Sequence, residues 1–220
     1  MKTAILVDGG FYRRRAVKLW GKKTADSRAK ELVAYCNAHI DYQQKYGDYN
    51  LYRIFYYDCP PIDKTVYHPL LKKGIDFRKS ETYSWTLEFF EKLKEQRKFA
   101  LRLGELSEDF ASFSLSTKKT KELLSGEITI DDLCEEDFNI NFQQKGVDMK
   151  IGIDITSMAY KQQVDQIILI AGDSDFVPAA KLARREGIDF ILDPMWNKIK
   201  PSLFEHIDGL NSQWGTRHDD

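Results

Sequence analysis

The stretch Gln166-Ile-Ile-Leu-Ile-Ala-Gly-Asp-Ser-Asp-Phe-Val-Pro-Ala-Ala-Lys-Leu-Ala-Arg-Arg-Glu-Gly187 joins an apolar run to two carboxylates and then to a helical pattern. The run from Ile167 to Ala171 is rich in β-branched side chains, which favours a strand buried on both faces of a parallel sheet. The residues after it recur at helical spacing until Gly187, a typical helix stop. We therefore expect Asp173 and Asp175 at the carboxyl end of a strand, where open α/β sheets bind ligands.

A second apolar strand leads to another carboxylate. Ala4-Ile-Leu-Val7 is followed by Asp8 and then by Gly9-Gly10. Aspartates at such positions can also cap a helix, because the side chain accepts hydrogen bonds from its first unpaired N–H groups. Capping is the alternative interpretation for each of these acids, but two strands that end in acids predict a shared acidic edge.

Further elements alternate along the chain. Strand, helix and strand in succession predict βαβ crossovers, and hence an α/β fold with a mostly parallel sheet of about five strands and helices on both faces. The segment 147–160 fits both a strand alternation and a helical spacing, and its length favours the helix, with Asp148 in the first turn. The remaining expected elements are helices at about 25–46, 83–98 and 201–208 and strands at 51–57, 99–104 and 189–192.

Composition bounds the class of protein. The chain has 220 residues, 42% of them hydrophobic, and predicts one large domain or one domain with an insertion. Its formal net charge of −1 is too small to attract the whole protein to nucleic acid or to a membrane. No apolar run approaches a membrane span, no secretory signal pattern is present, and the cysteines show no disulfide or metal spacing. We expect a cytoplasmic protein with no membrane partner.

Local charge is more informative than net charge. Six bases occupy positions 13 to 23, and among them Arg13, Arg14 and Lys18 follow closely on Asp8. Such a run is commonly a solvated helix face, but beside an acidic edge it is also suited to contact a phosphate backbone. Lys145, in the loop before Asp148, is a further candidate for the same contact.

The segment from about 107 to 142 interrupts the alternation of strands and helices. It carries nine acids and three bases, with one helical fragment at 118–125. We interpret it as an acidic insertion that packs weakly or covers one side of the site, and its charge makes it a poor surface for nucleic acid. Two roles stay open: it bounds a binding groove, or it mediates self-association into a homo-oligomer.

Several short pieces of the chain form an ordered set. They are Ile5-Leu-Val-Asp8-Gly-Gly10, Tyr56-Tyr-Asp58, Gln144-Lys-Gly-Val-Asp148, Ile153-Asp154, Ala171-Gly-Asp173-Ser-Asp175-Phe176 and the stretch from Ser202-Leu203 to Asp208. In this set the chain resembles the NYN domain family of PIN-like nucleases. The resemblance covers essentially the whole chain, residues 1–220, as one three-layer PIN-like domain apart from the insertion. One departure is Gly10, where some family members carry Asn.

The resemblance implies a divalent-metal-dependent endoribonuclease that hydrolyses RNA, expected to be single-stranded, with Mg²⁺ or Mn²⁺ as cofactor. Carried over by position, the metal ligands and catalytic residues are Asp8, Asp148, Asp173 and Asp175, with Asp154 as a further candidate for a fifth ligand. Oxygen ligands without His or Cys suit a hard cation. The alternative function is a nucleic-acid-binding or assembly module of the same fold with little or no turnover.

Overall fold

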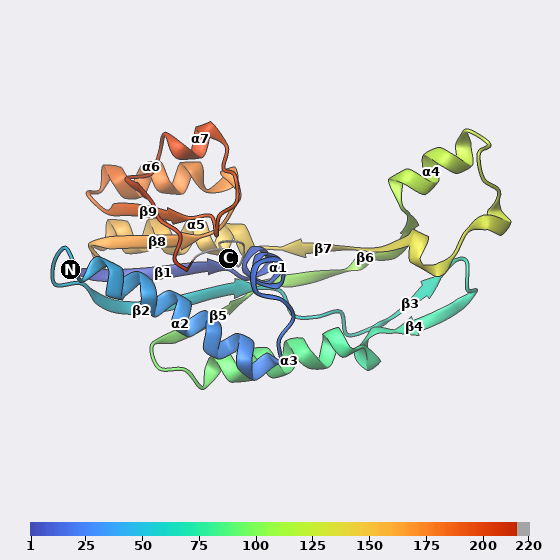
Figure 1. Cartoon of the computed structure of the whole chain (residues 1–220), viewed down its shortest axis with the longest axis horizontal. Helices are drawn as coiled ribbons and strands as arrows, with labels where there is room; N and C mark the ends of the chain where they lie inside the picture. Colours follow the sequence, from blue (N-terminus) through green and yellow to red (C-terminus); the bar gives the residue numbers. More distant parts are fainter. Residues whose placement is uncertain (215–220) are drawn as a thin grey trace, which may run out of the picture.

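A six-stranded sheet forms the middle of the protein (Figure 1). The computed structural model describes residues 1–214, without the side chains of residues 107–110, 143, 144 and 174. The strand order is β10-β9-β8-β1-β2-β5 and every pair is parallel, so the predicted parallel sheet is confirmed, with six strands rather than five. The strands are β1 (Lys2–Asp8), β2 (Asn50–Asp58), β5 (Phe99–Leu103), β8 (Gln166–Ile170), β9 (Asp189–Asp193) and β10 (Gly209–Leu210).

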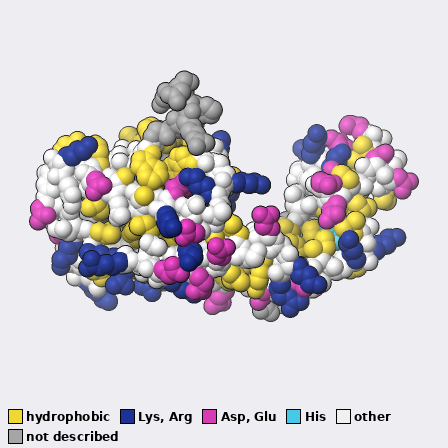
Figure 2. Space-filling model, turned by 60° about the horizontal axis from the view of Figure 1, so that its bottom comes forward, with side chains coloured by type: hydrophobic (Ala, Val, Ile, Leu, Met, Phe, Trp, Pro, Cys, Tyr) yellow, Lys and Arg dark blue, Asp and Glu magenta, His cyan; other side chains and the backbone are white. Residues whose placement is uncertain are grey.

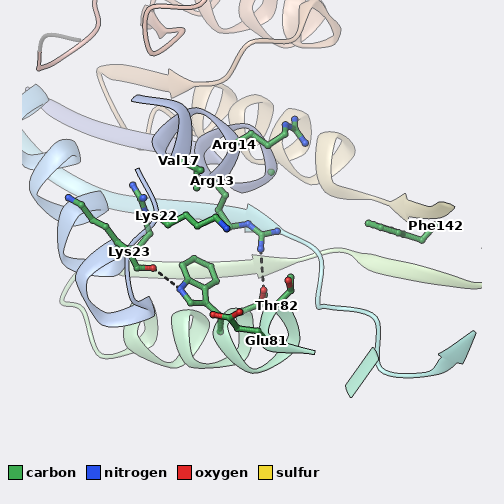
Figure 3. Close-up of a pocket in the computed structure, with 12 residues that line it drawn as sticks. Arg13, Arg14, Val17, Lys22, Lys23, Glu81, Thr82 and Phe142 are labelled. Carbon is green, nitrogen blue, oxygen red and sulfur yellow. Dashed lines mark hydrogen bonds between the residues drawn. The ribbon is translucent and has the colours of Figure 1, made fainter. Parts of the chain in front are cut away.

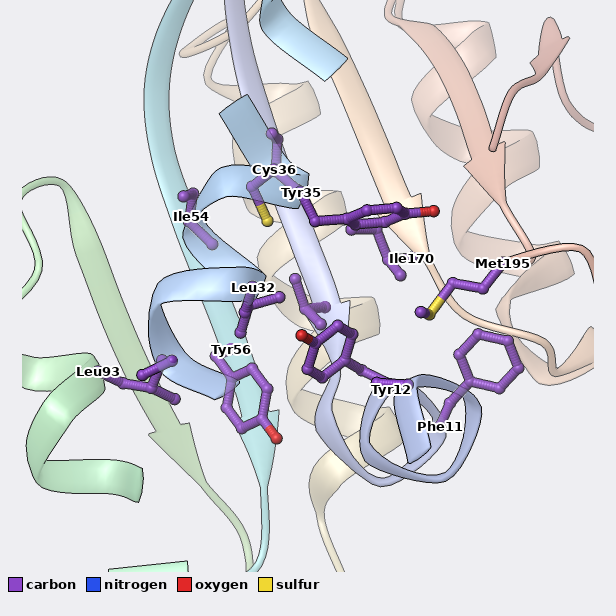
Figure 4. Packing of buried hydrophobic residues seen from close by; sticks show 14 of the residues in the cluster. Phe11, Tyr12, Leu32, Tyr35, Cys36, Ile54, Tyr56, Leu93, Ile170 and Met195 are labelled. Carbon is purple, nitrogen blue, oxygen red and sulfur yellow. The ribbon is translucent and has the colours of Figure 1, made fainter. Parts of the chain in front are cut away.

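Helices cover both faces of the sheet, which completes the expected three layers. Successive residues of a strand point to opposite faces, so Ile5 and Val7 join one core cluster while Leu6 joins the other. The first cluster packs under α1, α2 and α3 (Figure 4), and the second under α5, α6 and α7. These helices are α1 (Gly9–Trp20), α2 (Ala25–Gln43), α3 (Glu81–Lys94), α5 (Val147–Tyr160), α6 (Val177–Arg185) and α7 (Pro201–Phe204).

The ambiguous segment 147–160 is the helix α5, as its length predicted. Ile151 and Ile155 are fully buried, whereas Ile153 between them is 58% exposed. A strand would have placed all three side chains on one face, so their different burial agrees with a helix and not with a strand. In contrast, the closing helix expected at 201–208 ends at Phe204.

An arm projects from the edge of the sheet where the parallel strands end (Figure 1). It consists of the antiparallel pair β6 (Glu105–Leu115) and β7 (Phe138–Lys145), the helix α4 (Thr117–Leu124), and the antiparallel pair β3 (Thr65–His68) and β4 (Lys73–Asp76). Short 3-10 turns lie at Phe77–Lys79, Ile130–Asp132, Glu135–Asp137 and, outside the arm, Ser174–Phe176.

We expected the segment 107–142 to pack weakly or to cover one side of the site, and none of its described side chains is buried. Figure 2 shows the arm as a lobe beside the main body, with acidic and basic side chains on its surface.

The ring of His68, which is fully buried, lies 4.4 Å from that of Phe113 and 5.0 Å from that of Phe138. This aromatic contact joins the two hairpins into a small core. Both strands carry a period-2 signal that we did not use, since apolar and polar residues alternate from Ala111 to Leu115 and from Phe138 to Phe142. The contact with His68 is not readable in this way, because its partners are distant in the chain.

No helix within residues 1–214 is long and apolar enough to cross a membrane.

Candidate functional site

The sheet brings the predicted acids to one edge. Neighbouring strands β1 and β8 are paired in register up to Val7 and Ile170, so Asp8 and the turn that carries Asp173 and Asp175 follow adjacent strand ends. Asp148 lies in the first turn of α5, which packs against the 3-10 turn Ser174–Phe176.

Two glycines make this arrangement sterically feasible. A β-carbon on Gly9 would lie 2.5 Å from the Tyr56 ring and 2.6 Å from the Tyr57 carbonyl oxygen, so only glycine lets α1 start this close to β2. A β-carbon on Gly172 would lie 2.4 Å from the Phe11 ring. Gly172 therefore lets the Asp173 turn pack directly against α1, the helix that Asp8 begins.

Electrostatic repulsion links the acids. The pKa of Asp8 is raised from 3.8 to about 6 by burial first and then by the charges of Asp148 and Asp58, against the Phe11 N–H and Arg14, which lower it. Burial also raises the pKa of Asp148, as do the charges of Asp173 and Asp175. Each raised pKa means that the folded edge favours a proton or a cation at that carboxylate.

Among the side chains that the structure describes, no ion pair reaches these carboxylates. Arg14 lowers the pKa of Asp8 through its charge without forming an ion pair with it. An acidic group that is not neutralised by bases of its own protein is suited to bind an external cation.

Capping and metal binding are compatible for two of the acids. Asp8 Oδ1 accepts a hydrogen bond from the Phe11 N–H at 3.0 Å and so caps α1. Asp173 Oδ1 accepts one from the Asp175 N–H at 3.2 Å. Both bonds use Oδ1, and no described residue forms a hydrogen bond to Oδ2 of either side chain. Capping therefore uses one oxygen of each carboxylate, Oδ1, and leaves Oδ2 without a hydrogen bond from the described residues.

The acids are close enough to repel but do not form a closed metal site. Within the described part of the chain, no group of three or more His, Cys, Asp or Glu side chains is arranged to hold a metal ion. Two carboxylates at about 4 to 5 Å repel by roughly 3 to 4 kcal/mol at an effective dielectric constant near 20, which favours separated rotamers when no cation is present. The four carboxylates offer only oxygen ligands, which suit Mg²⁺ or Mn²⁺. Their side chains have to move before they can bind one ion together.

Asp154, the expected fifth ligand, is engaged elsewhere. Its carboxylate accepts a hydrogen bond from the Tyr57 hydroxyl at 2.7 Å and lies 3.4 Å from Arg102 Nε. Asp154 also does not influence the pKa of Asp148, six residues earlier on α5, because the two side chains point to different sides of the helix. The structure thus places Asp154 in a polar contact with β2 and β5, apart from the other acids.

The predicted basic residues divide into two kinds. Arg13 is half-buried and forms an ion pair with Asp58 at 3.0 Å, and it also donates to the Thr86 hydroxyl at 3.3 Å. Its guanidinium therefore holds α1 against β2 and α3. Arg14, Lys18 and Lys145 are exposed, and of these Arg14 lies nearest to Asp8.

A cleft of about 680 Å³ opens beside the acidic edge (Figure 3). It begins at Gly10, where an added β-carbon would lie 3.5 Å from Asp8 Oδ1. Figure 3 shows Arg13 directed toward α3 and Phe142 on the opposite wall. The other lining residues are Arg14, Val17, Lys22, Lys23, Arg28, Glu81, Thr82, Trp85 and Thr86.

Sequence reasoning did not single out Trp85 or Phe142 in this cleft. Trp85 occurs within an amphipathic helical pattern, where an aromatic residue is read as core. Phe142 lies at the end of the segment that we read as an insertion. Their shared position beside the basic residues depends on the packing of α3 and the arm around α1.

The chain is similar to known proteins in sequence and in structure. The sequence profile of the NYN domain matches residues 88–203, more than half of the chain. The uncharacterized protein MJ0482 of Methanocaldococcus jannaschii is 29% identical over 155 residues, which cover 60% of this chain and 64% of that relative. The chain therefore spans less than two thirds of the length of that relative.

Among solved structures, a protein of unknown function, VPA0982 from Vibrio parahaemolyticus RIMD 2210633, is similar with a TM-score of 0.46 and 13% identity. That similarity covers 95% of this chain and 90% of the other.

Proposed function

The chain belongs to the NYN domain family, and from that premise we propose that it is a metal-dependent endoribonuclease that hydrolyses phosphodiester bonds of single-stranded RNA. One observation carries the proposal: mutually repelling carboxylates lie at the carboxyl edge of the sheet without an ion-pair partner among the described side chains, beside a cleft lined by several bases. The bases suit the phosphate backbone, and the acids suit the cation that its hydrolysis requires.

Asp8, Asp148, Asp173 and Asp175 would hold Mg²⁺ or Mn²⁺ through their oxygens. When bound, such an ion supplies Lewis-acid activation of water and neutralises charge on the phosphate. The chain's own part is positional: the Phe11 N–H fixes Asp8, and the Asp175 N–H fixes Asp173. Arg14, next to Asp8, is placed to hold a phosphate oxygen of the substrate.

The test is cleavage of end-labelled single-stranded RNA with Mn²⁺, beside the DNA of the same sequence and an EDTA control. Asp173→Asn should lower cleavage by orders of magnitude. Asp165→Asn is the matched control, because Asp165 lies at the opposite end of β8 and accepts a bond from the Lys2 N–H at 2.6 Å. Undiminished cleavage by folded Asp173→Asn would remove this side chain from the site.

A circular RNA of the same sequence tests the mode of cleavage. An endonuclease linearises it, whereas an exonuclease needs an end and leaves it intact. Persistence of the circle while the linear RNA is degraded would contradict an endonucleolytic mode.

A second candidate function is a nucleic-acid-binding or assembly module with little turnover. It is favoured by the absence, among the described residues, of three donors already arranged around a cation. In that case RNA binding would persist with wild-type affinity while added Mn²⁺ produced neither cleavage nor a change in melting temperature.

A further inference from the structure

We infer that Trp85 is a base-stacking platform, and that the basic cleft binds single-stranded RNA through one unstacked base as well as through phosphates. The inference rests on the proposed function, since it takes RNA as the substrate and deepens the description of its path. It begins with the way in which the indole of Trp85 is fixed.

Two contacts orient the Trp85 ring. Its indole N–H donates to the Lys23 carbonyl oxygen at 2.9 Å, a bond drawn as a dashed line from Lys23 in Figure 3. The Phe89 ring stacks against it with centroids 5.0 Å apart and planes 16° apart. Phe89 is fully buried and belongs to the core, so the indole is supported from behind by the folded body. A ring fixed in this way pays little further entropy when a second ring stacks on it.

Trp85 is also partly exposed to two clefts. It lines the basic cleft that starts beside Asp8, and a neighbouring cleft formed with Ser84 and Glu88. The support by Phe89 and the exposure to these clefts together mean that the ring has one part packed in the protein and another accessible to a ligand. Supported aromatic rings in basic grooves are how proteins hold single strands without reading their sequence.

Bases near this ring are available for phosphate contacts. Arg14 and Lys22 both line the cleft and are exposed, and no ion pair with another described side chain occupies either. By contrast, Lys23 and the buried Arg28 both form ion pairs with Glu31. The cleft therefore offers available cations between the acidic edge and the indole.

The geometry favours an unpaired strand over a duplex. A base inside a duplex is stacked on its neighbours and presents only its edge, so it cannot lie on an indole without being extruded. A single strand that crosses the cleft can place a phosphate near Arg14 and Asp8 and a base on Trp85. We therefore assign the single-strand preference to this ring rather than to the charge of the cleft.

The experiment measures binding without chemistry, by fluorescence anisotropy in EDTA with a short labelled oligouridylate. An abasic oligonucleotide with the same number of phosphates serves as a second probe. Trp85→Leu should raise the Kd for oligouridylate about 5- to 100-fold. It should leave the Kd for the abasic probe unchanged, because the phosphate contacts remain. Trp85→Phe keeps a smaller ring and should recover part of the affinity.

Trp196→Leu is the matched control, since Trp196 is 53% exposed and lies outside the cleft. It should bind both probes as the wild type does. Circular dichroism and melting temperature verify that each variant is folded. Equal losses for oligouridylate and the abasic probe in Trp85→Leu, or no loss for either, would overturn the inference, as would a Trp85-dependent affinity for duplex RNA equal to that for the single strand.

Failure of this inference and failure of the nuclease proposal give different results. Trp85-dependent oligouridylate binding without Mn²⁺-dependent cleavage would retain the stacking platform and overturn the nuclease. Cleavage of single-stranded RNA by a Trp85→Leu variant with unaltered oligouridylate binding would retain the nuclease and overturn the platform.

Discussion

Two kinds of carboxylate end neighbouring strands of this sheet, and they differ in their partners. In the order β9-β8-β1-β2, the outer strands end at Asp193 and Asp58, while β1 ends at Asp8 and Asp173 lies in the turn after β8. The outer pair is buried, with exposures of 0% for Asp193 and 1% for Asp58. The inner acids lack ion-pair partners among the described side chains, and their charges repel that of the Asp148 carboxylate.

The outer carboxylates are saturated with donors. Asp193 accepts from the Tyr35 hydroxyl at 2.5 Å, the Ser212 hydroxyl at 2.6 Å and the Met195 N–H at 2.7 Å. His39 Nε2 lies 2.8 Å from the same carboxylate. A buried charge with this many partners stabilises the fold, whereas Asp173 is exposed and Asp8 is partly exposed, so water or an added cation can reach their carboxylates. The contrast separates the structural acids from the proposed metal ligands at the same sheet edge.

The contrast is tested most strongly by the same isosteric change at both kinds of site. Asp193→Asn removes the charge and presents an amide N–H to groups that donate, so it should lower the free energy of unfolding by about 3 kcal/mol. Urea unfolding followed by circular dichroism measures this. An unchanged denaturation midpoint would show that the Asp193 network contributes little to stability.

Asp173→Asn should have the opposite profile. Because Asn caps a turn about as well as Asp, the melting temperature in EDTA should stay within a degree or two of the wild type or rise. RNA cleavage with Mn²⁺ should fall about 100- to 1000-fold, roughly 2.7 to 4 kcal/mol in activation free energy. Both quantities are read from one preparation, and a destabilised but active variant would reverse the assignment of Asp173.

Mn²⁺ should stabilise the wild type, since a cation relieves the repulsion among the inner acids. At about 100 times its Kd the ion adds roughly 2.7 kcal/mol to the free energy of unfolding. For a domain of this size that raises the melting temperature by about 2 to 4 °C for each kcal/mol. Asp193→Asn should retain the increment and Asp173→Asn should lose most of it. Equal increments in all three proteins would place the ion elsewhere.

The stability without metal should depend on pH through Asp8. Burial raises its pKa to about 6 from an ordinary value of 3.8. Between these values the folded state binds more protons than the unfolded state, so the free energy of unfolding falls as the pH rises through this window. Asp8→Asn keeps the cap but not the titration, and at pH 7 in EDTA it should be more stable by on the order of 1 to 3 kcal/mol.

Urea midpoints of the wild type and Asp8→Asn from pH 4 to about 7 test this difference. Parallel curves would mean that Asp8 does not titrate within the window.

The smallest expected effect distinguishes two adjacent arginines. Arg14→Gln should reduce the salt dependence of oligonucleotide binding by about 0.7 in the logarithmic slope, as expected for one lost phosphate contact on a single strand. Arg13→Gln should leave the slope unchanged but lower stability, because it leaves the buried Asp58 without its cation. Anisotropy titrations at several salt concentrations measure both slopes, and a larger slope change for Arg13 would exchange the roles.

Arg13 and Arg14 also show where sequence reasoning ends. They are neighbours in one basic run, and no local pattern tells them apart. The rotation of α1 directs one toward Asp58 and leaves the other exposed beside Asp8. Likewise, Asp154 matches its place in the family pattern, but its position on α5 directs it toward Tyr57.

The sequence by itself determined the parallel sheet, the helices on both faces and the edge at which the acids meet. Those features follow from local signals: the apolar run before Asp173, the helical spacing around Ile155 and the acids that follow strand ends. Only the tertiary structure decided which acids have partners and which cations remain available. It alone joined the two hairpins of the arm and brought Trp85 to the cleft, because these outcomes depend on contacts between residues far apart in the chain, which periodicity does not encode.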